Sequence, residues 1–370
     1  MLVLKNLLRR RVRTLLSVLG VALGIAAIVA FHAVGRGFRE SLDRYMRESG
    51  AQLLVVNRTV TDPAFSRVTR EEQEFIWSLP EVEHLSPGTF TLVSPRGLKV
   101  KPRRLLTLPL FGRTPGDRLL AKFQGKVRGR LLEREEDVIV GEDAARELGL
   151  APGDALELFG QTFRVAGVYE SDIQFERAGA MACNSVLQRQ LRMGESVSMG
   201  FLYLRPGASE DRVREAVEAR FGHLDVIRTD QFTQYYNQLE YIDWFVWIVS
   251  LVSVAVGALE VLNTMLMSVS ERTREIGTLR AVGWSRRRVL ALVLLEGTVI
   301  SVAGGLLGLG AGVLGAELLI LWAPRGLDTL YTPLLFAQAF AVAVLLGVGG
   351  AIYPAWRAAR LSPTEALKYE

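Results

Sequence analysis

Residues 268–284 combine charged and apolar side chains at a spacing suited to docking on another protein. In a helix, Ile276, Leu279 and Val282 form an apolar stripe with acidic and basic residues on either side. Such a helix can place its stripe in a groove on a partner while its charges fix the orientation. The same pattern is typical of a helix that lies on a membrane surface, and the residues alone do not separate the two roles.

Acidic residues inside apolar runs form a second group with unusual chemistry. Glu260 lies deep in one run, where a carboxylate costs about 2.5–3.5 kcal/mol to insert and therefore faces protein or water. The simpler interpretation is a carboxyl group hydrogen-bonded to a neighbouring helix, and the alternative is a specialised polar lumen. Glu296 and Glu317 lie near the ends of another run, where we expect their side chains to snorkel toward water.

Glycines recur at helical spacing in two apolar runs. Gly304, Gly308 and Gly312 are spaced by four residues, and Gly20 and Gly24 repeat this spacing near the N-terminus. Small residues at this spacing let the backbones of two membrane helices approach closely. The sequence therefore predicts helix-packing faces at these positions.

Motifs for catalysis and nucleotide binding are absent from the sequence. The Gly125-Lys126 pair is followed by Val127 and does not belong to a G-x-x-x-x-G-K-[ST] phosphate loop. No H-E-x-x-H, G-x-S-x-G or C-x-x-C pattern occurs, Cys183 is the single cysteine, and the three histidines are scattered. We therefore expect no enzymatic activity, no cofactor and no metal site in this chain, and an outside source of energy.

The elements that position these residues follow from the apolar content of the chain. Of its 370 residues, 49% are apolar, and the mean hydropathy is +0.23. About 20 apolar residues cross a bilayer as a helix. The sequence predicts four such spans, over residues 14–34, 244–269, 297–322 and 334–353, with residues 285–295 as a basic helix along the inner interface.

Positive charge beside these spans predicts their orientation. The five basic residues before the first span have no acidic residue among them, and six arginines separate the second and third spans. The positive-inside rule therefore places both termini in the cytoplasm and residues 35–243 outside it. This topology accounts for the net charge of +5, so we expect contact with membrane lipid and none with nucleic acid.

The segment between the first two spans is polar enough to fold in water. Local patterns predict a capped helix from Thr69, a strand and a helix over residues 137–148, a hairpin around Gly160 and a helix after Ser209. The flanks, Gly37–Ser49 and Asp230–Asp243, suit either stalk helices or ordinary surface helices.

The predicted fold class is a membrane α-helical protein with four transmembrane helices and an α+β extracytoplasmic domain inserted between helices 1 and 2. The predicted parts are residues 1–34, with the first span; residues 35–243, the extracytoplasmic domain; and residues 244–370, with the other spans and a cytoplasmic coupling segment over residues 270–288.

Three segments share their patterns with one family of membrane proteins. Residues 271–283 have the order E-R-T-R-E-I-G-x-x-R-A-x-G, and residues 353–367 contain P-A-x-x-A-A-x-L-x-P-x-E-A-L. Residues 138–168, with Pro152-Gly153-Asp154 at their centre, match an extracytoplasmic domain of the same family. The chain thus resembles the MacB- and FtsX-type permeases, also called type VII ABC transporters.

The resemblance implies a permease driven from the cytoplasm. In this family a separate ABC ATPase, which binds ATP and Mg, pushes on the loop after the second span, and the motion reaches the extracytoplasmic domain. The implied ATPase-coupling residues are Glu271, Arg272, Arg274, Glu275, Ile276, Gly277, Arg280 and Gly283. Many relatives have a small or apolar residue at the position of Glu260, so this position departs from the family.

The resemblance further implies a bacterial inner-membrane location, a second permease subunit, identical or different, and a periplasmic adaptor or substrate protein as partners. Relatives handle lipoproteins, peptides, lipids or antibiotics. Two other functions stay open from the sequence: an FtsX-like regulator of cell-wall hydrolases, for which the external segment is large, and an ATP-independent membrane scaffold or sensor.

Overall fold

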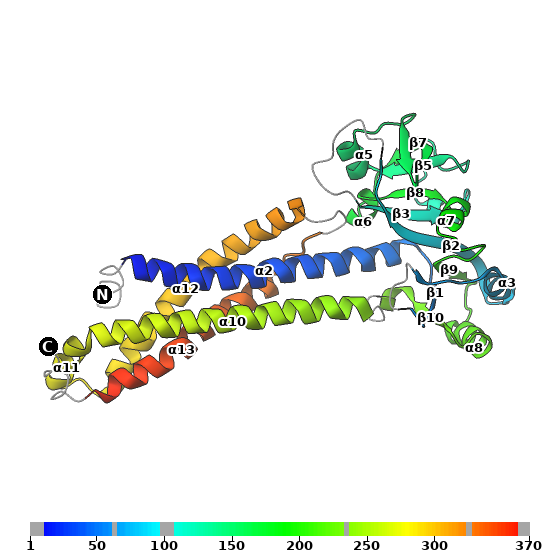
Figure 1. Ribbon diagram of the computed structural model, residues 1–370. Helices are drawn as coiled ribbons and strands as arrows, with labels where there is room; N and C mark the ends of the chain where they lie inside the picture. Colours follow the sequence, from blue (N-terminus) through cyan, green and yellow to red (C-terminus); the bar gives the residue numbers. More distant parts are fainter. Residues whose placement is uncertain (1–10, 61–64, 97–106, 233–236, 323–327, 362–370) are drawn as a thin grey trace. The chain divides into compact units, whose positions relative to one another are not determined.

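Four long helices of the computed structural model are apolar enough to cross a membrane. The structure describes residues 11–60, 65–96, 107–232, 237–322 and 328–361. The helices are α2 (Arg11–Glu48), α10 (Asn237–Glu271), α12 (Arg286–Trp322) and α13 (Pro333–Arg360) (Figure 1). With an α+β domain between α2 and α10, they confirm the predicted fold class. Residues 286–295, predicted as a basic helix along the inner interface, form the first part of the continuous helix α12.

The chain divides into two compact units. The first, which we call the helix unit, contains Met1–Arg36, Asp243–Leu321 and Thr329–Glu370. The second, which we call the external unit after its predicted location, contains Gly37–Ile242 and Trp322–Asp328. Both flanks considered as stalks contain helix: α2 continues to Glu48, and α10 begins at Asn237, after a short 3-10 turn at Thr229–Gln231.

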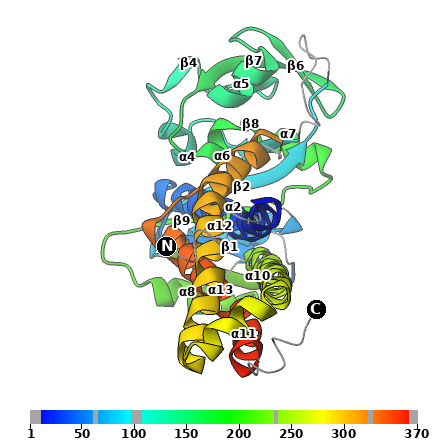
Figure 2. The ribbon, with the colours of Figure 1, turned by 90° about the vertical axis from the view of Figure 1, so that its left-hand side faces the viewer.

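The long helices α2, α10, α12 and α13 of the helix unit form a bundle (Figure 1, Figure 2). Glycines bring these helices into close contact. A Cβ atom added at Gly308 of α12 would lie 2.7 Å from the Ala22 backbone oxygen and 2.7 Å from the Ile25 Cβ atom of α2. On the other side of α2, a Cβ atom added at Gly24 would lie 3.2 Å from the backbone oxygen of Ser253 in α10. Helix α2 therefore packs against both α10 and α12.

The other predicted packing glycines lie at the same two contacts. Cβ atoms added at Gly304 and Gly312 would come within 3.0 Å of α2, at Val21 and Val29. A Cβ atom added at Gly20 would lie 2.9 Å from the Cγ atom of Glu260. Gly20 thus leaves space on α2 for the aliphatic part of this intramembrane side chain.

The external unit contains a mixed ten-stranded sheet in the described residues. Its order is β10-β1-β9-β2-β3-β8-β5-β7-β4, with β6 also paired to β7. The strands are β1 (Leu53–Asn57), β2 (Val82–Val93), β3 (Leu108–Arg113), β4 (Val127–Gly129), β5 (Asp137–Gly141), β6 (Ala155–Leu158), β7 (Gln161–Tyr169), β8 (Ala180–Cys183), β9 (Met199–Leu204) and β10 (Leu224–Arg228).

Two lobes build this unit. We define the first lobe as β10, β1, β9 and β2 with helices α3 (Arg70–Ser78) and α8 (Glu210–Arg220). The second lobe comprises the remaining strands with α4 (Arg118–Ala121), α5 (Glu142–Leu148), α6 (Gln174–Arg177) and α7 (Asn184–Gln190). Each lobe has its own buried apolar cluster, and a third cluster, which includes Tyr45, Phe111 and Phe201, contains residues of both lobes.

Four local predictions in this unit are confirmed. The Thr69 side chain and Glu72 form the capping box of α3. Gly149 ends α5 in the left-handed conformation, at φ 65°. The strands β6 and β7 pair as a hairpin around Gly160, and the Ser209 hydroxyl accepts a hydrogen bond from the third residue after it, Arg212.

Candidate coupling site

The segment between α10 and α12 forms a short helix with a break at each end. Arg272, at φ −110°, separates α10 from α11 (Thr273–Ala281). Gly283, at φ 98°, follows α11 and allows the Trp284 amide to donate to the Leu279 carbonyl. The coupling segment is therefore an independent helix rather than a continuation of either long one.

Arg272 fixes this helix to the bundle through a buried ion pair. Its Nη1 atom donates to the two carboxylate oxygens of Glu296 in α12, at 2.8 and 3.0 Å, and its Nε atom donates to Glu275, at 3.0 Å. Glu296 is 2% exposed. The prediction that Glu296 snorkels toward water is wrong, because an arginine of the preceding loop neutralises it within the protein.

A second ion pair joins α2 and α10 at the ends that are predicted to face the cytoplasm. Both terminal nitrogens of Arg13 donate to the carboxylate of Glu271, at 2.7 and 2.9 Å. One turn deeper, the hydroxyl groups of Ser17 and Thr264 share a buried hydrogen bond of 2.6 Å. These contacts hold the start of α2 against the end of α10.

Helix α11 buries one side in the bundle and exposes the other. Ile276 and Gly277 are buried, and Ile276 belongs to the apolar core of the bundle. By contrast, Arg274 and Glu275 are exposed, and Val282 is 79% exposed. Ile276 is therefore committed to the protein's own core, and the apolar stripe predicted from the sequence is divided between the bundle and the surface.

The remaining predicted coupling residues support the turn after α11. The Arg280 guanidinium donates to the Trp284 carbonyl at 3.2 Å, and Gly283 is exposed. Sequence reasoning missed Arg13 as part of this site. Arg13 lies at the start of an apolar run, but a basic residue at this place is also what the positive-inside rule predicts for any membrane span.

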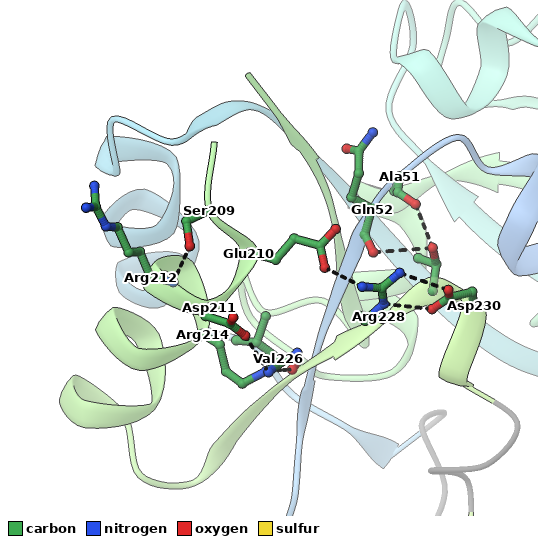
Figure 3. Close-up of polar contacts among 11 residues, drawn as sticks. Ala51, Gln52, Ser209, Glu210, Asp211, Arg212, Arg214, Val226, Arg228 and Asp230 are labelled. Carbon is green, nitrogen blue, oxygen red and sulfur yellow. Dashed lines mark hydrogen bonds and ion pairs between the residues drawn. The ribbon is translucent and has the colours of Figure 1, made fainter. Parts of the chain in front are cut away.

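In the external unit, the segments joined to α2 and α10 are tied to each other (Figure 3). Strands β1 and β10 pair antiparallel, with Leu53 opposite Arg228. The Arg228 guanidinium lies between Glu210 and Asp230, at 3.0–3.1 Å from both carboxylates. The next residue, Thr229, donates its hydroxyl to the Ala51 carbonyl at 2.7 Å. The chain therefore enters and leaves this domain at two neighbouring strands that are joined by hydrogen bonds.

Two family models match this chain and together cover most of it. The model described as FtsX-like permease C-terminal matches residues 247–363, and the model described as MacB-like periplasmic core domain matches residues 14–220. The first match contains the predicted coupling segment, and the second contains most of α2 and most of the external domain.

Curated relatives extend the similarity over nearly the full chain. The macrolide export ATP-binding/permease protein MacB of Bdellovibrio bacteriovorus is 27% identical over 401 residues, covering 99% of this chain and 61% of the relative. The protein of the same name from Nitrosomonas europaea is 27% identical over 387 residues, covering 97% and 57%. The chain thus spans about three fifths of the length of these relatives.

Among solved structures, the periplasmic region of MacB from Actinobacillus actinomycetemcomitans is 15% identical, with a TM-score of 0.39. The match covers 50% of this chain and 92% of that one.

Proposed function

This chain belongs to the MacB- and FtsX-like family of ABC transporter permeases, a family of multi-pass membrane proteins, and on that basis we propose that a cytoplasmic ABC ATPase drives it. The ATPase binds ATP and Mg in a partner subunit and docks on the exposed side of α11. A second permease subunit completes the complex, and the external domain moves to export or extract a substrate. Lipoproteins, peptides, lipids and antibiotics are the candidate classes.

The ion pair of Arg272 and Glu296 is the observation that supports this proposal most directly. A force applied to α11 reaches α12 through this pair, since charged groups buried together resist separation. Arg13 and Glu271 extend the connection to α2, which continues into the external unit. An isolated scaffold would have no need for a rigid link at its cytoplasmic helix.

Substitutions at this ion pair test the coupling. We expect Arg272→Gln and Glu296→Gln each to reduce the nucleotide-dependent movement of the external domain by at least about tenfold, because breaking a buried ion pair by removing one partner costs about 3–5 kcal/mol. The double variant should recover part of the movement, since neither charge remains. The full chain, reconstituted with its ATPase in proteoliposomes, carries a fluorophore on Arg205→Cys to report the movement.

A matched control is the exposed ion pair of Arg118 and Glu83 in the external unit, at 2.6 Å. Arg118→Gln removes an equally short contact but leaves no buried charge, so it should not change the movement. The proposal fails if ATP hydrolysis by the partner has no effect on the fluorophore in the unsubstituted chain. It also fails if the variants at Arg272 and Glu296 match this control.

A further inference from the structure

The last two turns of α13 expose aromatic and basic side chains on one face. These residues are Tyr353, Trp356, Arg357 and Arg360, which are spaced by three or four residues and are all exposed. On the opposite face, Ala355 is buried in the apolar core of the bundle. The packing of α13 thus fixes which side chains this end of the helix presents outward.

This face lies where a membrane helix leaves the hydrocarbon core. Helix α13 has 28 residues, or about 42 Å of length, which exceeds a core of about 30 Å. Its predicted span ends at Tyr353, so Arg360 lies about 10 Å farther along the helix axis. Tyrosine and tryptophan side chains favour this boundary. The two arginines are therefore placed at the level of the lipid headgroups.

The Arg360 side chain is directed back along α13, toward the predicted span. Its guanidinium carbon lies 3.9 Å from the centre of the Trp356 ring, one turn earlier in the helix. The Trp356 ring is in turn stacked with that of Tyr353, at 6.3 Å between centres. Stacking covers the face of a guanidinium, whereas its N–H donors lie in the plane and stay accessible to an anion. The aromatic pair therefore holds these donors near the membrane boundary.

Neither Arg357 nor Arg360 has an acidic partner among the described residues. By contrast, Arg13 and Arg272 of the same bundle are both paired with carboxylates. Guanidinium groups bind phosphate through parallel N–H donors. The two unpaired arginines therefore suit a phosphate group from another molecule.

An exposed apolar stripe on α13 leads to these arginines. Leu345, Gly349, Ile352 and Trp356 follow one another at spacings of four, three and four residues, so they share one face of the helix. Leu345 is 69% exposed and Ile352 is 55% exposed. A Cβ atom added at Gly349 would have no described atom within 4 Å. The stripe therefore has space for an acyl chain beside the aromatic and basic residues.

We propose that this end of α13 binds an anionic phospholipid, with the phosphate at Arg357 and Arg360 and one acyl chain along the apolar stripe. A zwitterionic lipid carries an ammonium group next to its phosphate, which repels the two guanidinium groups and weakens binding. A soluble protein could neutralise the arginines but would not reach the stripe inside the predicted span. The continuity of the basic and apolar parts along one face therefore favours a lipid.

Lipid binding to the full chain in detergent micelles tests the proposal. The probes are dioctanoyl phosphatidylglycerol, dioctanoyl phosphatidylcholine and glycerol 3-phosphate, each titrated and measured by native mass spectrometry. We expect phosphatidylglycerol to bind at least about fivefold more tightly than either of the others, because arginines beside a membrane helix attract anionic headgroups. Because no ATPase takes part, this test can fail while the coupling test succeeds, and the reverse.

A matched control lies at the same depth on α12. Cβ atoms added at Gly297 and Gly305 would each lie 2.6 Å from α13, at Ala351 and Ala343 respectively, so the two helices are antiparallel. Arg288 lies nine residues before Gly297, and the stacked arginine of α13 lies nine residues after Ala351. Nine residues are about two and a half turns, which places Arg288 on the side of α12 opposite to α13.

Variants separate the site from a general charge effect. Arg360→Gln should weaken binding of phosphatidylglycerol at least about fivefold by removing the charge, and Trp356→Leu should do so by removing the ring that holds the guanidinium. Arg288→Gln removes an equal charge at the same depth and should change binding by less than about twofold. Circular dichroism confirms that each variant is folded.

Each of four outcomes would overturn the assignment. Equal binding of the two lipids would assign the arginines to a protein partner, and equally tight binding of glycerol 3-phosphate would assign them to a soluble phosphate. Equal losses in Arg360→Gln and Arg288→Gln would show a general charge effect. Unchanged binding in folded Arg360→Gln and Trp356→Leu proteins would place the lipid elsewhere.

Discussion

Individual charged residues of this chain differ in what their ion pairs can do. The pair of Arg272 and Glu296 is largely withdrawn from water, whereas Glu135 and Arg189 are about half exposed, at 52% and 59% of their side chains. An exposed pair contributes little to stability because water and salt screen it. We therefore expect the first pair to matter mechanically and the second to adjust stability only slightly.

The pair of Glu135 and Arg189 predicts a pH dependence in the external domain. Hydrogen bonds from the Arg189 guanidinium and the Ser185 hydroxyl lower the pKa of the Glu135 carboxyl to about 2. Because the folded pKa is below the ordinary value of 4.5, its stabilisation is complete above about pH 4.5 and is lost as the pH falls toward 2. Its size should be below about 1 kcal/mol, given the exposure of both groups.

The measurement is the apparent unfolding temperature of the unsubstituted chain and of Glu135→Gln between pH 7 and pH 2. The two proteins should differ at neutral pH and converge in acid. A difference that stays constant over this range would show that Glu135 acts through something other than its charge.

At this scale, the sequence predicts a coupling role for residues 271–283, which stays a prediction, but it does not predict how these residues are held. The pattern over residues 271–283 is local, so it can be recognised without a structure. The contact of Arg272 with Glu296 joins residues 24 positions apart in different helices, and an apolar-run analysis treats each helix separately.

The packing of α12 against α2 depends on some glycines of α12 and not on others. On α12, a Cβ atom at Gly308 would lie within 2.7 Å of α2, whereas at Gly310 it would have no described atom within 4 Å. The two glycines are two residues apart in the same helix. They therefore separate a packing requirement from the general effect of glycine on a helix.

Gly308→Ala should destabilise the protein and Gly310→Ala should not. The first change forces α12 away from the α2 backbone, at about 1–3 kcal/mol. The second change adds a good helix former in open space, which stabilises by about 0.4–1 kcal/mol. Thermal unfolding in nanodiscs measures both, and equal effects at the two positions would contradict the packing observed at Gly308.

Helices were more predictable than the sheet. Each membrane helix is specified by one continuous apolar run, and the caps of α3, α5 and α8 lie within a few residues of the elements they end. The order of the ten strands depends on pairings between distant segments, such as β1 with β10. No local pattern specifies such partners, so the sequence predicted an α+β domain without its topology.

Across the whole molecule, the orientation in the membrane remains a prediction. The native Cys183 is 3% exposed, and burial raises the pKa of its thiol to about 11, so it should not react with maleimides near neutral pH. A cysteine introduced at Arg274 or Arg205 is then the single reactive thiol. We expect an impermeant maleimide to label Arg205→Cys on intact cells and Arg274→Cys only after permeabilisation. Labelling of both from one side would contradict both the topology and the proposed function.

The paired strands β1 and β10 also have a consequence for evolution. The chain enters the domain between α2 and α10 at β1 and leaves it after β10, and these two strands are paired. The domain is therefore an insertion whose two ends lie close together. A different folded module with similarly spaced ends can replace it without redesign of the helix unit. Under the proposed function, recombination at these two joints can therefore change the substrate while the helix unit is retained.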